Sequence, residues 1–207
     1  MRRFSVAPAL TFSGRRFKGL RGFAGKPFHP PLTDIPIAAY LFGAAFDVLS
    51  LVLSGSHARL GTELFHAATW VLFGGAGVSV LAAGTGWADW HHSSTPGTQA
   101  RRTVNAHALT MIVVTLLTLT DLGVRLGLHA LASTPVGVAV LSVVVAVLVS
   151  FGATLGGSLV YDYGFNVETA GDSPVWHPSE QDVLPGQKPV SVAPQSRRSS
   201  DEVQQVP

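Results

Sequence analysis

Three charged residues interrupt long apolar stretches of this sequence, and their types suit a buried ion cluster. Asp47 follows a run from Ile37 to Phe46 that contains no charged residue. Asp121 and Arg125 lie in a later apolar stretch, four residues apart, a spacing that brings two side chains to one face of a helix. A carboxylate in such surroundings needs a partner. The pattern predicts an Asp47–Arg125–Asp121 cluster, which either holds helices in register or forms part of a proton or ion path.

Two histidines are the candidates for cofactor chemistry. Neutral imidazoles on facing helices can bind a haem iron from both sides. His29 lies in the segment that enters the first apolar stretch, and His107 lies in the first turns of a later one. They can share one iron if the entry segment folds back over the helices. Histidines inside helices also hydrogen-bond to neighbouring helices, and that alternative stays open.

Several kinds of active site are excluded by the residues present. The sequence contains no cysteine, which rules out disulfides, thiolate zinc sites, cysteine-bound iron–sulfur clusters and a cysteine nucleophile. It also lacks a Gly-x-Ser-x-Gly elbow, a His-Glu-x-x-His pair and a phosphate-binding loop. The adjacent His91 and His92 do not have the spacing of a zinc site. We therefore predict no catalytic residue and no metal-ion site, and we favour a protein that is not an enzyme.

The composition indicates a membrane protein. Of the 207 residues, 47% are hydrophobic and 13% are charged, against about 25% charged in an average soluble domain. A helix needs about 20 apolar residues to cross a bilayer. Four segments are long enough, over residues of about 33–54, 62–87, 103–126 and 135–159. We predict an all-α fold, a polytopic four-helix transmembrane bundle with disordered tails at both ends.

The bundle is expected to fill residues 33–161, with a tail on either side. Residues 1–32 contain basic residues and no acid, which predicts a cytoplasmic arm attracted to anionic lipid. Residues 162–207 are rich in Pro, Ser, Gln and acids and have no apolar period, which predicts a disordered cytoplasmic tail.

The basic residues predict the orientation in the membrane. Four spans put both termini and a polar loop over residues 88–102 on one side, and that side holds every Lys and Arg except Arg59 and Arg125. The positive-inside rule places that side in the cytoplasm, so we expect a multi-pass protein of the plasma (inner) membrane. The same distribution accounts for the basic pI without a nucleic-acid partner. The bilayer is the expected partner; a redox protein, another membrane subunit or a second copy of the chain stay open.

A second polar layer is expected near the cytoplasmic face. It contains Asp34, Asp89 and Tyr161, at the same depth as the two histidines. Thr33 or Asp34 is expected to cap the first helix, with Pro36 in its first turn, where a missing N–H has no cost.

Small residues predict where helices pack closely. Gly75, Ser79 and Ala83 recur four residues apart in the second span, and Gly152 and Gly156 form a Gly-x-x-x-Gly pair in the fourth. Such stripes let helix backbones approach each other in membranes.

Several motifs resemble a bacterial family of four-span membrane proteins of unknown function, the domain of unknown function 2231 family, and in particular an actinobacterial-like branch. The matching pieces lie within residues 25–168 and are Pro27-Phe-His-Pro-Pro-Leu-Thr-Asp-Ile-Pro-Ile, Phe46-Asp-Val-Leu, Gly84-Thr-Gly-Trp-Ala-Asp-Trp, His107 after a basic pair, and Gly156-Gly-Ser-Leu-Val-Tyr. In actinobacterial relatives, domains of this kind look to be sometimes joined to Rieske-type iron–sulfur domains. This association implies redox work. Relatives commonly carry His at the position of Ser158; if that His binds iron in them, this chain keeps only His29 and His107.

Two functions follow from these observations. The first is a non-enzymatic integral membrane protein, a structural or partner-binding subunit whose polar layers hold the helices together. The alternative is a redox or proton-relay component, with haem b bound through His29 and His107. No other cofactor is suggested by the sequence.

Overall fold

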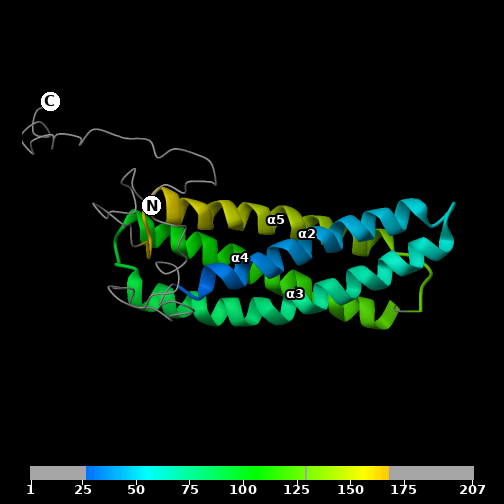
Figure 1. Ribbon diagram of the computed structural model, residues 1–207, viewed down its shortest axis with the longest axis horizontal. Helices are drawn as coiled ribbons and strands as arrows, with labels where there is room; N and C mark the ends of the chain where they lie inside the picture. The colour runs from blue at the N-terminus through cyan, green and yellow to red at the C-terminus, as the bar shows by residue number, and fades with distance from the viewer. Residues whose placement is uncertain (1–26, 129, 168–207) are drawn as a thin grey trace, which may run out of the picture. The chain divides into compact units, whose positions relative to one another are not determined.

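The computed structural model describes residues 27–128 and 130–167, which form a bundle of helices (Figure 1). The helices are α2 (His29–Leu53), α3 (Ala58–Ser93), α4 (Gln99–Leu128) and α5 (Val136–Tyr161). All four are long and apolar enough to cross a membrane. The predicted fold class, an all-α membrane four-helix bundle, is therefore confirmed. Residues 1–26 of the predicted arm and 168–207 of the predicted tail lie outside the described residues.

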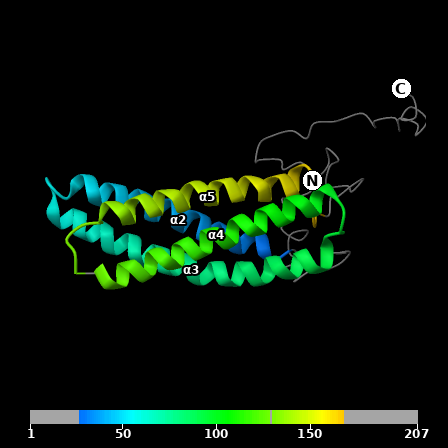
Figure 2. The same cartoon turned by 180° about the vertical axis from the view of Figure 1, so that it is seen from behind.

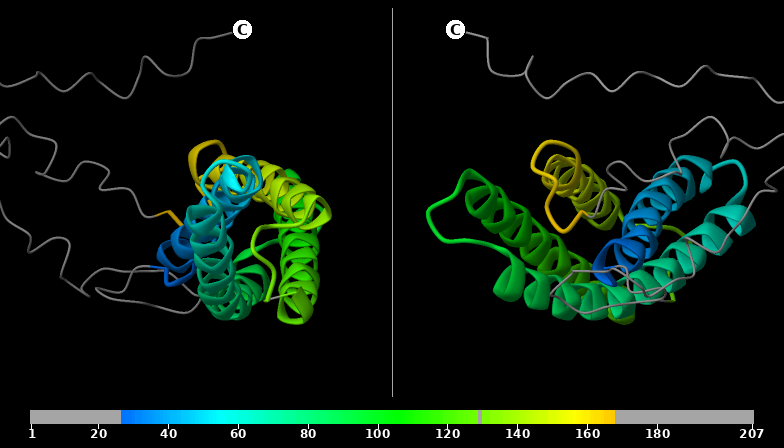
Figure 3. Two further views of the ribbon diagram at one scale, coloured as in Figure 1. Left: turned by 90° about the vertical axis from the view of Figure 1, so that its right-hand side faces the viewer. Right: turned by 60° about the vertical axis from the view of Figure 1, so that its left-hand side comes forward.

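Successive helices run in opposite directions, so the bundle has two distinct ends (Figure 2). The start of α2, the α3–α4 connection and the end of α5 lie together at what we call the His end. The α2–α3 and α4–α5 connections lie at the opposite end, called the Arg end. Helix α2 packs against α3 and α5, and α4 packs against the same two helices. Helices α2 and α4 are therefore diagonal partners across the bundle axis, which the end view shows (Figure 3).

Close contact between α2 and α3 depends on glycine. A Cβ atom at Gly75 would lie 2.6 Å from the Cβ of Ala39, and one at Gly43 would lie 2.8 Å from the Leu72 side chain. Gly75 and Ser79 are buried as predicted, but Ala83 is exposed. Steps of four residues drift around a helix that has 3.6 residues per turn. The buried stripe therefore continues one residue earlier, through Ala82.

The glycine pair of α5 has the same role against α4. A Cβ atom at Gly152 would lie 2.6 Å from the sulfur of Met111, and one at Gly156 would lie 3.2 Å from Cε1 of His107. The side chains of α4 therefore occupy the space that these two glycines leave open.

Helix α2 begins earlier than predicted. Its first residue is His29, so Thr33 and Asp34 lie inside the helix and do not cap it. The Thr33 hydroxyl instead donates to the carbonyl oxygen of Pro30 at 2.7 Å. Proline is tolerated in a first turn because the backbone N–H there has no helical partner. Pro30, and not Pro36, therefore lies in the first turn of α2. Pro36 lies in the helix interior.

The polar loop predicted over residues 88–102 is mostly helical. Helix α3 continues to Ser93 and α4 begins at Gln99, which leaves a short connection. The guanidinium carbon of Arg101 lies 3.8 Å from the Trp90 ring centre. Arg101 also donates to the carbonyl oxygen of Trp90 at 3.2 Å. This cation–π contact and hydrogen bond fasten the last turns of α3 to the first turn of α4.

We expect Gly75→Ala to destabilise the bundle. The new methyl group would meet the backbone-anchored Cβ of Ala39, and overpacking of this kind costs about 1–3 kcal/mol. The melting temperature in detergent measures the effect. Gly74→Ala is the matched control, because a Cβ there has nothing within 4 Å. Equal melting temperatures for the two variants would contradict the proposed close packing.

Candidate functional site

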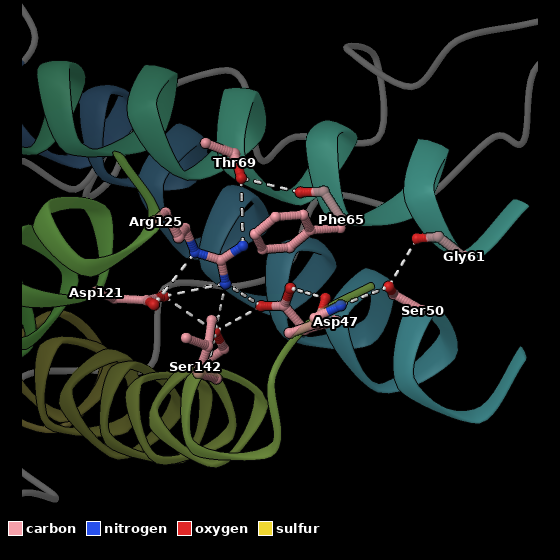
Figure 4. Close-up of polar contacts among 10 residues, drawn as sticks. Asp47, Ser50, Gly61, Phe65, Thr69, Asp121, Arg125 and Ser142 are labelled. Carbon is pink, nitrogen blue, oxygen red and sulfur yellow. Dashed lines mark hydrogen bonds and ion pairs between the residues drawn. The ribbon is translucent and has the colours of Figure 1, made fainter. Parts of the chain in front are cut away.

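An ion cluster lies inside the bundle near the Arg end (Figure 4). Arg125 Nη2 donates to Asp47 Oδ2, which joins α4 to its diagonal partner α2. Arg125 Nε donates to Asp121 Oδ1 at 3.1 Å, and Nη2 donates to Asp121 Oδ2 at 3.2 Å. The three residues are 0–1% exposed. The structure therefore places in contact the three side chains whose pairing the sequence spacing predicts.

Hydroxyl groups from other parts of the chain complete the cluster. The Ser142 Oγ of α5 lies 2.6 Å from Asp47 Oδ2 and 3.0 Å from Asp121 Oδ2. The Thr134 hydroxyl donates to Asp47 Oδ1 at 3.0 Å. These polar groups meet deep inside an otherwise apolar core, so the network fixes the helices at one relative height.

Helix α3 joins the cluster through weaker contacts. Arg125 Nη1 donates to the Thr69 hydroxyl at 3.3 Å. The guanidinium carbon also lies 5.5 Å from the Phe65 ring centre, within cation–π range. All four helices therefore contact this one guanidinium group or the carboxylates that it binds.

The hydroxyl groups of the cluster are not predicted from the sequence. Ser142 is a single polar residue within a run of Val, Ala and Leu, and Thr134 directly precedes Pro135 at the helix start. An isolated hydroxyl in an apolar span is a weak signal, because Ser and Thr also bond to their own helix backbone. Only the angular position of Ser142 on α5 shows that it faces the carboxylates.

The second arrangement is a pair of histidines at the His end. The ring centres of His29 and His107 lie 6.3 Å apart, and the ring planes are inclined at 83°. The two residues come from the diagonal helices α2 and α4, so they face each other across the bundle interior. The structure thus brings together the two histidines selected from the sequence.

Both imidazoles are oriented by backbone carbonyl groups. The Nδ1 atom of His29 lies 2.9 Å from the carbonyl oxygen of Ala82, and that of His107 lies 2.8 Å from the carbonyl oxygen of Gly152. A carbonyl oxygen only accepts, so each Nδ1 carries the hydrogen. In a neutral imidazole the lone pair is then on Nε2, the arrangement that metal-binding histidines adopt.

A glycine lies against each imidazole, one helical turn beyond the carbonyl that binds it. A Cβ atom at Gly86 would be 2.7 Å from Cε1 of His29, and one at Gly156 would be 3.2 Å from Cε1 of His107. Gly86 follows Ala82 by four residues, and Gly156 follows Gly152 by four. The α2–α3 and α4–α5 hairpins therefore hold their histidines in the same way.

The two hairpins are equivalent at the ion cluster as well. Arg125 follows Asp47 by the same number of residues as His107 follows His29. Asp47 and Arg125 thus occupy corresponding positions on α2 and α4, and they pair across the same diagonal as the histidines. The bundle contains two similar helical hairpins that differ in the charge at this position.

A buried tyrosine lies between the two polar sites. Tyr40 is 1% exposed and comes between His29 and Asp47 along α2. Its hydroxyl is buried and has no hydrogen-bond partner among the described residues. The interior therefore carries polar groups at three heights.

The other residues of the predicted cytoplasmic-face layer are dispersed. Asp34 is exposed on α2, and the Tyr161 side chain at the end of α5 is 88% exposed. Asp89 is buried in α3. Within the part of the chain that the structure describes, no group of three or more His, Cys, Asp or Glu side chains is placed to hold a metal ion. The histidine pair is thus the candidate cofactor site.

We expect Arg125→Ala to reduce strongly the yield and melting temperature of the protein. The change leaves the Asp47 and Asp121 carboxyl groups without their cation, and breaking a buried pair costs about 3–5 kcal/mol. Arg59→Ala is the control, since Arg59 pairs with Glu63 on the exposed surface of the same end and surface pairs contribute little. A stable, monodisperse Arg125→Ala variant would refute the structural role of the cluster.

Comparison with known proteins agrees with this architecture. Residues 25–169 match a family described as "Predicted membrane protein (DUF2231)", and this match spans α2 to α5. No curated protein and no solved structure matches the chain. The chain is a multi-pass membrane protein, and it belongs to the DUF2231 family.

Proposed function

We propose that this protein binds one haem b between His29 and His107 and carries electrons in the membrane. The observation that carries the proposal is the geometry of the pair, in which two imidazoles from diagonal helices face each other inside the bundle. Cofactor sites of helical bundles are built in this way, from side chains that project inward from facing helices.

The distance between the rings fits one metal atom held by both. Two metal–nitrogen bonds of about 2 Å, extended by roughly 1 Å from each nitrogen to its ring centre, place the ring centres about 6 Å apart. The separation of 6.3 Å agrees with this value. When both planes contain the metal–nitrogen axis, they can be inclined at any angle to each other, so the angle of 83° is also compatible.

The surroundings favour haem over a free metal ion. Two imidazoles are too few ligands for a closed protein site, whereas haem supplies the remaining four nitrogens itself. The carbonyl groups of Ala82 and Gly152 bind Nδ1 of each ring and leave Nε2 as the atom that could bind a metal. Haem held by both His29 and His107 would supply electron transfer.

The distribution of basic residues supports one orientation of this site in the membrane. Arg101 and Arg102 lie at the His end, and the N-terminal 26 residues carry further positive charge without any acid. By the positive-inside rule we infer that the His end faces the cytoplasm of a plasma-membrane protein. A redox protein that exchanges electrons at the cytoplasmic face is the partner that this orientation suits.

We expect protein purified from cells with ample haem to show a Soret band that sharpens on reduction with dithionite. His29→Ala and His107→Ala should each lose that spectrum, because each removes one of the two imidazoles that would hold the haem. His57→Ala is the control, as His57 lies on the exposed α2–α3 connection. A featureless visible spectrum from well-folded wild-type protein would refute haem binding.

We also expect Gly86→Ala to reduce haem content severalfold without unfolding the bundle. The added Cβ would be 2.7 Å from Cε1 of His29, so the His29 ring would have to move away from the position proposed to hold the haem. Gly84→Ala, two residues away on α3, is the matched control because nothing lies within 4 Å of its added Cβ. The Soret absorbance per protein measures the occupancy. Equal occupancy in both variants would contradict the assigned role of His29.

A second candidate function is supported by the ion cluster. A network that joins all four helices through Arg125 suits a non-enzymatic structural or partner-binding subunit, whose main requirement is a fixed shape. A protein without a visible spectrum that purifies with another membrane subunit, and keeps that subunit in His107→Ala, would favour this function over electron transfer.

A further inference from the structure

The ion cluster contains one more acid than base. Asp47 and Asp121 both contact Arg125, which is always protonated. If both carboxyl groups were ionised, the cluster would carry one net negative charge in the interior of a membrane protein. A charge that is neither paired nor hydrated is strongly unfavourable there.

Among the described residues, no other ionisable side chain hydrogen-bonds to Asp47, Asp121 or Arg125. Helix α2 contributes Asp47, and α4 contributes Asp121 and Arg125. The groups that α3 and α5 present are Thr69, Phe65 and Ser142, none of which titrates near neutral pH. Thr134, on the connection to α5, adds a hydroxyl.

The hydrogen bonds around Ser142 accommodate an additional proton, because Ser142 Oγ accepts from Arg125 Nη2 at 3.0 Å and has a second lone pair. Its Oγ lies 2.6 Å from Asp47 Oδ2, 3.0 Å from Asp121 Oδ2 and 3.1 Å from the carbonyl oxygen of Val138. A serine hydroxyl has one hydrogen to donate, so it satisfies one of these three acceptors. A proton on one carboxyl group lets that group donate to Ser142 Oγ, while Ser142 donates to the other carboxylate.

We propose that the Asp47–Asp121–Arg125 cluster is a proton-binding site that holds one proton at neutral pH. The proton is carried by one carboxyl group and bridged to the other through Ser142. When the proton moves from Asp121 to Asp47, Asp121 gives its hydrogen to Ser142 Oγ as Ser142 gives its own to Asp47. The number of atoms and the total charge are unchanged. The site does not depend on the proposed haem.

Infrared spectroscopy of protein made with isotopically labelled aspartate tests this proposal directly. The holoprotein is measured in dodecyl maltoside, which has no carbonyl group, at neutral pH. We expect a carboxylic-acid carbonyl band that shifts with the aspartate label. It should persist in Asp34→Asn, an exposed site on α2, and disappear in both Asp47→Asn and Asp121→Asn, because the one remaining carboxylate then balances Arg125.

Two results would overturn the proposal. One is wild-type protein without a label-sensitive acid band at neutral pH. The other is a band that persists in both cluster variants, which would assign it to another aspartate. Loss of the haem spectrum would leave these infrared results unchanged, so the two proposals fail independently.

The stability of the protein gives a second test that does not depend on spectral assignment. An aspartate in the unfolded chain is ionised in water at neutral pH, so the folded wild-type protein holds one proton more. Its folding equilibrium constant should therefore fall as the pH rises above neutral, by up to about tenfold per pH unit relative to Asp121→Asn. Parallel pH profiles for the two proteins would contradict a bound proton.

Discussion

The burial of the Arg125 guanidinium is the constraint on which the rest of this bundle depends. A charged side chain in hydrocarbon costs several kcal/mol unless it is paired, and Asp47 on the diagonal helix is within reach at one relative height of α2 and α4. Once that relative height is fixed, His29 and His107 also lie at one height, because they precede the two charged residues by the same number of residues. The ion pair at one end therefore aligns the imidazoles at the other.

Apolar packing and polar pairing have separate tasks in this fold. Each hairpin is held together by small residues, such as Gly75 against Ala39 and Gly152 against Met111. These contacts bring adjacent backbones close, but packing of small residues constrains sliding along the helix axis only weakly. The diagonal helices α2 and α4 are instead related by specific side-chain pairs. The side chains proposed to carry chemistry are thus also the side chains that pair the two hairpins.

The sequence predicted the parts of this structure that depend on composition and on spacing along one helix. The four apolar stretches predict the fold, and the four-residue step from Asp121 to Arg125 predicts part of the cluster. It did not predict Ser142, because the direction of a hydroxyl around α5 depends on how that helix is rotated in the bundle. It placed the start of α2 too late, because a run of prolines is as typical of a loop as of a first helical turn. The functional roles of the histidines and of the ion cluster are proposals that go beyond both the sequence and the structure.

The correspondence of the two hairpins has a consequence for how chains assemble. If hairpins of two copies paired like with like, two α2–α3 units would pair with each other, and so would two α4–α5 units. Each such pairing would preserve a pair of histidines, so the His end alone would not distinguish it from the native arrangement. The Arg end would distinguish the two arrangements, because Asp47 would then face a second Asp47 and Arg125 would face a second Arg125. The opposite charges at these corresponding positions therefore favour the pairing of unlike hairpins and disfavour the pairing of like hairpins from two copies.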